Sequence, residues 1–296
     1  MTAGDGLDME ATFSSYRDHV VRSAPDALPL ALRTWARLDP ARWPLEWHLP
    51  LWLGETLGLK RRISQQLVTS NVLGLASVRL ADDLVDGDLL AEDISRARDL
   101  SRVLYEAAVR PYRGLFPAES VFWRRLDGWM AAWREATEPI PAGSAIPPGY
   151  LARRGAPLMI SALAVCLLAD RESAFERIDE CLDHALTAMV LFDHACDWRE
   201  DLAADRWNAF VAASSKRGEE ADVLEAMMTG RSVAPYFEHV DTELDRAVAL
   251  ADGAGVERLA SQLRQLRTTF AAEARRLDRR YGELGAAAVR LIFEAA

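Results

Sequence analysis

The chain has 296 residues, 50% of them hydrophobic and 27% charged, and a formal net charge of -10. This is the composition of a folded globular protein with a sizeable core, and its acidity argues against nucleic acid or an anionic membrane surface as the main partner. The polar, acidic first ten residues do not resemble a signal peptide, and there is no long uncharged apolar run. We therefore expect no membrane span and a cytoplasmic location.

Apolar residues recur at helical spacing along nearly the whole chain, while β-branched runs are short. We predict an all-α protein, a single-domain helical bundle over residues 1–296 with about ten to twelve helices. The first 25 residues are a candidate for a flexible N-terminus. The expected helix ends lie at clusters of proline, glycine and polar residues, namely Pro40–Pro50, 86–88, Pro111–Pro117, Pro139–Pro148, 214–218, 230–235 and 253–255.

Three cysteines, Cys166, Cys181 and Cys196, lie in apolar stretches without the CxxC spacing of metal or redox sites. Their odd number and spacing do not fit a disulfide framework or a zinc site. We expect three buried, reduced thiols.

The first acidic motif ends the segment from Asn71 to Asp88, which reads NVLGLASVRLADDLVDGD. An apolar helix runs here into Asp82, Asp83 and Asp86. Carboxylates at a helix C-terminus meet the negative end of the helix dipole and repel one another, so we expect a compensating positive group. Mg²⁺ fits, because it prefers oxygen ligands. The alternative is a solvated acidic helix end capped by Gly87.

The second acidic motif lies in VLFDHACDWREDLAADRWNAFV, which starts at residue 190. Asp193, Asp197 and Asp201 are four residues apart and share one helix face with Glu200. Arginines such as Arg206 could relieve the repulsion, so a solvated acidic face is the alternative here. If the two acidic helices face each other across a bundle, their carboxylates surround a site for several Mg²⁺ ions and a diphosphate.

The first acidic motif, Asp82-Asp83-Leu84-Val85-Asp86, resembles the DDxxD motif of class I terpene and isoprenoid synthases. The acidic stripe formed by Asp193, Asp197 and Asp201, hereafter the second stripe, resembles the second metal motif of terpene cyclases. Arg153 or Arg154, followed by Gly155, resembles the diphosphate-sensing arginine and helix-break glycine of that superfamily. Arg280 and Tyr281 are similar to its C-terminal Arg-Tyr pair. The resemblance covers most of the chain from residue 80 onward. It implies a class I isoprenoid synthase bundle with a central active-site cavity.

The resemblance also implies a mechanism, in which Mg²⁺, as three ions with substrate bound, helps to ionise a prenyl diphosphate and release diphosphate. Phe192 and Trp198 flank the second stripe and are the candidates for lining the cavity. The sequence is compatible with a homodimer but does not determine the oligomeric state. The implied metal ligands are Asp82, Asp83, Asp86, Asp193, Asp197, Glu200 and Asp201, and the implied diphosphate contacts are Arg153, Arg154, Gly155, Arg206, Arg280 and Tyr281.

The second motif departs from the cyclase pattern at Asp197, Glu200 and Asp201, which replace a hydroxyl residue, a lysine and a glutamate. Its D-x3-D-x2-ED pattern is closer to squalene and phytoene synthases, although their central tyrosine and VAG-type helix have no counterpart. Three interpretations follow: a terpene cyclase acting on a C10–C20 substrate, a prenyl-coupling or chain-elongating transferase, and a non-catalytic helical binding protein. In the cyclase register Asp201 binds metal, and Glu200 is a candidate partner for Arg206.

Overall fold

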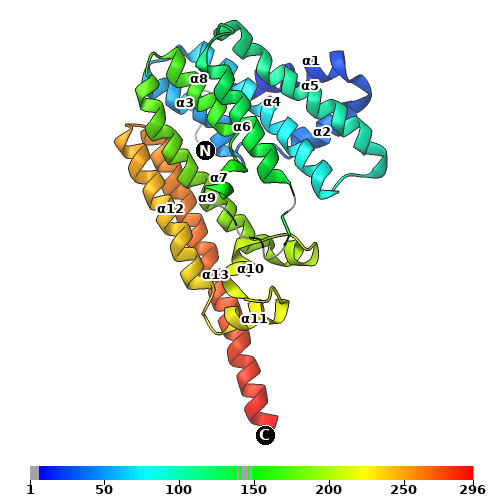
Figure 1. The fold of residues 1–296 in the computed structure, drawn as a ribbon, viewed down its shortest axis with the longest axis vertical. Coiled ribbons are helices and arrows are strands. Elements are labelled where there is room, and N and C mark those ends of the chain that lie inside the picture. Colours follow the sequence, from blue (N-terminus) through cyan, green and yellow to red (C-terminus); the bar gives the residue numbers. More distant parts are fainter. Residues whose placement is uncertain (1–6, 139, 142–143, 145, 147–148, 296) are drawn as a thin grey trace. The chain divides into compact units, whose positions relative to one another are not determined.

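The structure is a computed structural model that describes residues 7–138, 140–141, 144, 146 and 149–295, and only the backbone of 288–289 and 291–295 (Figure 1). Every regular element in these residues is a helix, which confirms the all-α prediction. The α-helices are α1 Met9–Ser23, α2 Leu28–Ala36, α3 Pro44–Leu57, α4 Arg61–Asp86, α5 Ile94–Leu115, α6 Val121–Thr137, α7 Tyr150–Arg153, α8 Leu158–Leu168, α9 Glu172–Ala203, α10 Ala209–Ser214, α11 Glu220–Met228, α12 Val233–Gly253 and α13 Glu257–Ala295.

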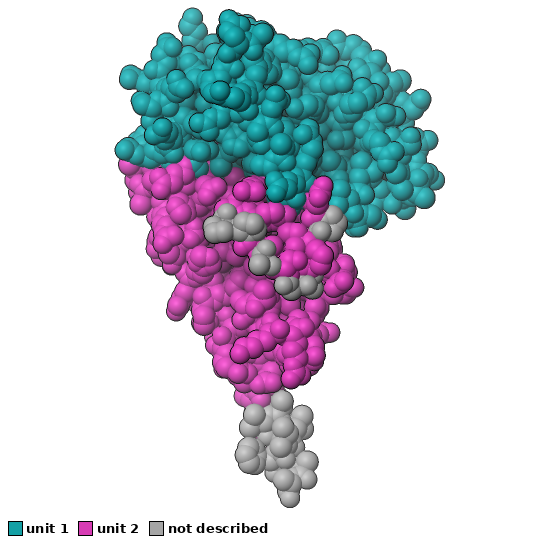
Figure 2. Space-filling model, in the orientation of Figure 1, with its two compact units in different colours: residues 1–137, 155–179, 254–256 teal, residues 138–154, 180–253, 257–296 magenta. Residues whose placement is uncertain are grey.

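The chain divides into two compact units, which Figure 2 colours separately. Unit 1 consists of residues 1–137, 155–179 and 254–256, and unit 2 of residues 138–154, 180–253 and 257–296. Each unit is assembled from segments that are far apart in the sequence. The first acidic motif belongs to unit 1 and the second to unit 2. The single-domain prediction stays a prediction.

Unit 1 is built around α4, which packs along α5 and α3. Small residues allow α4 and α5 to approach closely. The Ser77 hydroxyl donates to the backbone oxygen of Ser101 at 2.8 Å, and the Ser101 hydroxyl donates back to the backbone oxygen of Ser77 at 2.9 Å. This exchange satisfies polar groups at the helix interface and places the C-terminal end of α4 firmly in the unit.

The N-terminal segment expected to be flexible includes α1. Tyr16 and Val20 on α1 are fully buried, and the Tyr16 hydroxyl donates to the backbone oxygen of Ala31 at 2.8 Å. Residues 9–23 are therefore a packed part of unit 1.

Pro50 was expected to interrupt helix formation, but it lies inside α3. A proline within a helix has no N–H group to donate to the carbonyl oxygen four residues earlier. Here that oxygen belongs to Glu46, and it accepts a hydrogen bond from Nδ2 of Asn71 at 2.7 Å. A side chain of α4 thus replaces the missing backbone donor, and the helix continues. Pro111 likewise lies inside α5.

Unit 2 contains the C-terminal part of α9 together with α10 to α13. The α12 and α13 helices are antiparallel, because Arg267 pairs with Asp241 and Asp245 while Arg264, further back along α13, pairs with Asp252. The Tyr236 hydroxyl of α12 donates to the backbone oxygen of Leu191 at 2.8 Å and fastens α12 to α9. In the described part of the chain, no helix has the length and apolarity needed to cross a membrane.

Candidate functional site

The first acidic motif forms the C-terminal end of α4. Gly87 caps the helix in the left-handed region with a φ of 77°, and the backbone N–H of Asp88 donates to the oxygen of Asp83 at 3.1 Å. This is the geometry in which glycine commonly ends a helix. The cap by Gly87 is confirmed, and the carboxylates do lie at the negative end of the helix dipole.

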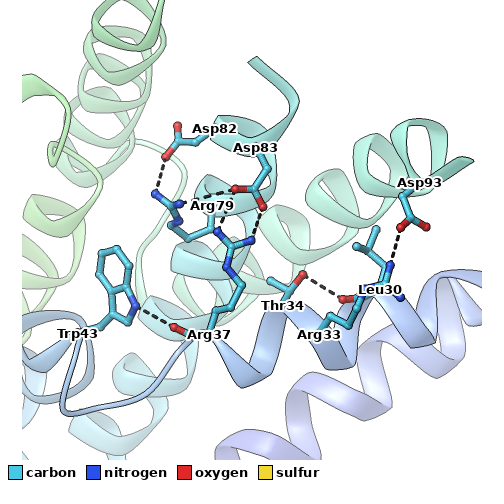
Figure 3. Close-up of polar contacts among 9 residues, drawn as sticks. All are labelled: Leu30, Arg33, Thr34, Arg37, Trp43, Arg79, Asp82, Asp83 and Asp93. Carbon is cyan, nitrogen blue, oxygen red and sulfur yellow. Dashed lines mark hydrogen bonds and ion pairs between the residues drawn. The ribbon is translucent and has the colours of Figure 1, made fainter. Parts of the chain in front are cut away.

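Asp83 is 1% exposed and is held by arginines (Figure 3). Arg37 donates two hydrogen bonds to its carboxylate, at 2.7 and 3.1 Å, and the side-chain hydrogen bond to Asp83 raises the pKa of Arg37. Arg79 lies 3.6 Å from both Asp82 and Asp83. The indole N–H of Trp43 donates to the backbone oxygen of Arg37 at 3.0 Å, which fixes the end of α2. The expected counter-charge is thus supplied, at Asp83, by the protein itself.

Asp82 and Asp86 lie one helical turn apart on α4, Asp82 half-buried and Asp86 exposed. Among the described residues, no group of three or more His, Cys, Asp or Glu side chains is placed to hold a metal ion. Mg²⁺ usually needs only one or two carboxylates, completed by water and phosphate oxygens, so the oxygen donors of this pair fit it. A metal role for Asp83 would require its carboxylate to exchange the two hydrogen bonds from Arg37.

The second acidic motif ends α9. Asp193, Asp197 and Glu200 are exposed along this helix. The helix stops just after Ala203, where Asp205 adopts a left-handed φ of 53° and the N–H of Arg206 donates to the oxygen of Asp201 at 2.8 Å. Asp201 and Asp83 therefore occupy equivalent places, because each accepts the backbone hydrogen bond that closes its helix end.

Asp201 is less exposed than the other acids of its motif and is engaged by two neighbours. The side-chain amide of Asn208 donates to its carboxylate at 2.7 Å, and Nε of Arg206 lies 3.4 Å from it. Asn208 also accepts from the N–H groups of Phe210 and Val211, and so caps α10. Arg206, which the sequence offered as a partner for Glu200, pairs in the structure with Asp201.

Cys196 lies between the exposed acids of α9. Cys166 and Cys181 are buried as expected, but Cys196 is exposed, because it shares the solvent-facing side of α9 with Asp193 and Asp197. Desolvation by its neighbours and then the charges of Asp193, Asp197 and Glu273 raise the pKa of the Cys196 thiol to about 11. The acidic stripe of α9 therefore lies near Glu273 of α13, which pairs with Arg276 at 3.1 Å.

The predicted diphosphate-binding arginines lie at three places. Arg153 ends α7 and is half-buried, while Arg154 and Gly155 form the turn before α8, so the expected helix break is present. Burial, reinforced by the charge of Arg154, lowers the pKa of His194 to about 3. Arg154 therefore lies near the second acidic motif. Arg280 is exposed, with its guanidinium carbon 5.8 Å from the ring centroid of the buried Tyr281.

The two aromatic candidates for the cavity pack within unit 2. Phe192 stacks on Phe270 with ring centroids 3.7 Å apart and meets Phe237 edge-on at 6.2 Å. Trp198 is 4% exposed, and the guanidinium of Arg199 lies 4.9 Å from its ring. Their lining of a substrate cavity stays a prediction.

Several residues of these sites went unnoticed in the sequence. Arg79 carried a local signal, because it precedes Asp82 by three residues and Asp83 by four, the spacings at which helix side chains meet. Arg37 and Glu273 carried none, since only the tertiary fold brings them to the acids. Asn208 could have been read as a helix cap before the apolar run of α10.

Comparisons with known protein families, with curated proteins and with solved structures found no match for this chain.

Proposed function

We propose that the protein is a Mg²⁺-dependent, cytoplasmic class I terpene synthase, which ionises a C10–C20 allylic prenyl diphosphate and cyclises the resulting carbocation. Its substrate would be the prenyl diphosphate and its products a cyclic terpenoid and diphosphate. The chain order of acidic motif, Arg-Gly turn, second acidic motif and Arg-Tyr pair supports this proposal.

One structural observation carries the proposal furthest. Both acidic motifs divide their carboxylates in the same way. Asp83 and Asp201 are each the least exposed acid of their motif and accept hydrogen bonds from Arg37 and Asn208. The pairs Asp82/Asp86 and Asp193/Asp197, each one helical turn apart, are more exposed to solvent, and Arg79 lies 3.6 Å from Asp82. Like charges at this spacing destabilise a helix, so a bound cation would relieve them. Two such pairs offer hard oxygen ligands of the kind that Mg²⁺ takes.

The roles of the residues follow from their chemistry. Asp82, Asp86, Asp193 and Asp197 would hold Mg²⁺, which when bound would neutralise the charge of the departing diphosphate. Arg154 and Arg280 are exposed and could donate to diphosphate oxygens in the bidentate manner that suits arginine. Asp83 and Asp201 would position the two helix ends.

A second candidate function is a non-catalytic helical binding protein. The observation in its favour is the bonding of Asp83 by Arg37 and of Asp201 by Asn208 and Arg206, which gives part of each motif a purely structural use. In that case the exposed acids would be solvated surface.

Incubation with C10, C15 and C20 prenyl diphosphates and Mg²⁺, followed by product analysis, tests the proposal. A cyclase gives a product with the carbon number of its single substrate, whereas a coupling enzyme joins two chains. Asp82→Asn combined with Asp193→Asn should abolish turnover, and Asp99→Asn, at an exposed site on α5, is the matched control. Absence of turnover in the parent, together with no rise of its melting temperature on adding Mg²⁺ and pyrophosphate, would favour the binding protein.

A further inference from the structure

A groove runs between α12 and α13 on unit 2, with a volume of about 730 Å³. Its residues all belong to these two helices. Apolar side chains form its floor, among them Phe237, Val240 and Leu244 from α12 and Phe270 from α13. Small-molecule sites in proteins have volumes of roughly 300–1,000 Å³ and predominantly apolar linings, and this groove has both properties.

The floor of the groove is fixed from behind. Phe192 of α9 stacks on Phe270 with the two rings 4° from parallel, and the same ring meets Phe237 edge-on. Ala271 and Ala274 leave the α13 side of the groove wide, because their side chains are short. A supported aromatic floor beside small residues is a preformed surface for an apolar ligand.

The charges around the groove balance. Three arginines and three acidic residues line it. Arg267 is held by Asp241 through two hydrogen bonds, at 2.5 and 2.8 Å, and Arg264 pairs with Asp252. With no net charge at its rim, the groove favours neither an anion nor a cation, so electrostatics points to a neutral ligand.

The dimensions of the groove select an elongated ligand. Its lining extends along α13 from Arg264 to Asp278, which at 1.5 Å per residue is about 21 Å. An extended chain of roughly 17 carbons matches its length, since each bond of such a zigzag chain advances it by about 1.2–1.3 Å.

We propose that the α12–α13 groove binds a neutral, linear hydrocarbon or alcohol with a main chain of about 17 carbons. This site goes beyond the proposed function, because it needs no metal and uses neither acidic motif. Its residues Phe270 and Ala271 contact the chain, and Phe192 positions the ring of Phe270.

Binding should be measured by calorimetry, first in EDTA and then with Mg²⁺ in its place. Three probes are used: a linear C20 isoprenoid alcohol, whose main chain has 16 carbons, a saturated alcohol of similar main-chain length, and the monophosphate of the isoprenoid alcohol. Both alcohols should bind, and the phosphate should give no gain in affinity. Ala271→Trp fills the groove and should weaken binding at least about tenfold. Ala274→Phe is a second blocking variant for the case in which the first one unfolds. Ala286→Trp, on an exposed stretch of α13 outside the groove, should leave binding unchanged.

Unchanged affinity in a folded Ala271→Trp or Ala274→Phe variant would overturn the proposal, as would binding that appears only with Mg²⁺. A clear preference for the isoprenoid over the saturated alcohol would assign the groove to isoprenoids within the proposed class. Tighter binding of the phosphate would contradict the neutral-ligand assignment. Because the terpene synthase proposal is tested by turnover with Mg²⁺, either proposal can fail while the other stands.

Discussion

The side-chain amide of Asn208 donates a hydrogen bond to the carboxylate of Asp201 at 2.7 Å while its oxygen caps α10. One buried residue thus connects the end of the second acidic motif to the next helix. Asn208→Ala removes the cap and leaves Asp201 without this donor, so we expect a loss of about 2 kcal/mol in the free energy of unfolding. Urea denaturation measures it.

The matched variant for this position is Asn208→Asp. It keeps the capping oxygen but places a carboxylate against Asp201, so it should be at least as destabilising as Asn208→Ala near neutral pH and should recover at acidic pH. Equal stability of Asn208→Asp and the parent at pH 7 would show that the hydrogen bond to Asp201 contributes nothing.

The second acidic motif should separate metal binding from stability. Asp193→Asn should need much more Mg²⁺ for turnover and leave the free energy of unfolding unchanged or raised, because it removes like-charge repulsion on α9. Asp201→Asn should also need more Mg²⁺, because Asp201 positions the helix end that carries Asp197. It should in addition lose about 1 kcal/mol of stability, because the charge facing Asn208 and Arg206 disappears. Glu200→Gln should be mild in both assays. A Mg²⁺ titration of turnover and urea denaturation test the ranking. A larger Mg²⁺ defect in Glu200→Gln than in Asp201→Asn would contradict the positioning role of Asp201 and point to Glu200 as a metal ligand.

Glu46 should make stability depend on pH. One of its carboxylate oxygens is buried and forms no hydrogen bond within the described part of the chain, and burial raises the pKa of Glu46 to about 7. The native state therefore retains a proton that the unfolded chain releases above pH 4.5, so stability should fall as the pH rises from about 4.5 to 7 and stay lower above that.

Glu46→Gln keeps the shape of the neutral side chain and removes this titration. At pH 8 it should be more stable than the parent by on the order of 2 kcal/mol, and at pH 4 the two should be equal. Thermal unfolding at both pH values measures the difference. A Glu46→Gln variant that gains as much at pH 4 as at pH 8 would contradict the raised pKa.

Arg37 and Asp83 should be energetically coupled. Arg37→Gln leaves the buried Asp83 carboxylate without its main counter-charge and should cost about 2–3 kcal/mol, whereas Asp83→Asn leaves a half-exposed guanidinium that water can solvate and should cost less. A double-mutant cycle between the two should give a coupling of about 1–2 kcal/mol. The exposed pair Arg102 and Glu106 on α5 is the control, for which we expect a coupling of less than about 0.5 kcal/mol.

Local features of the sequence predicted the fold class and the ends of the acidic helices. The helical spacing of apolar residues and the glycine after the acids involve residues only a few positions apart in the sequence. Both predictions based on them, the all-α class and the Gly87 cap, are confirmed. The prediction of ten to twelve helices fell short of the thirteen in the described residues, because helices as short as α7 and α10, with 4 and 6 residues, leave little periodic signal.

Tertiary contacts account for what the sequence could not predict. The prediction of a helix end at Pro50 was wrong. The backbone oxygen of Glu46, which receives no N–H from proline, accepts a hydrogen bond from Asn71, and Asn71 lies on another helix. Arg37 is 46 residues away from Asp83, a separation at which no spacing rule applies. Exposure of Cys196 likewise depends on which face of α9 is covered, and the apolar residues around it gave the opposite expectation.

The burial of Asp83 and its two hydrogen bonds from Arg37 affect how a mutational screen of this protein should be interpreted. A screen scored by activity in cells would rank Asp83 among the most sensitive positions of the DDxxD run, because its loss lowers the amount of folded protein whatever the chemistry of the site. Asp86, exposed at the same helix end, would score as sensitive only if the reaction itself needs it. The contrast between these two positions, with protein abundance measured alongside activity, therefore separates a working catalyst from a helical protein that only carries the motif.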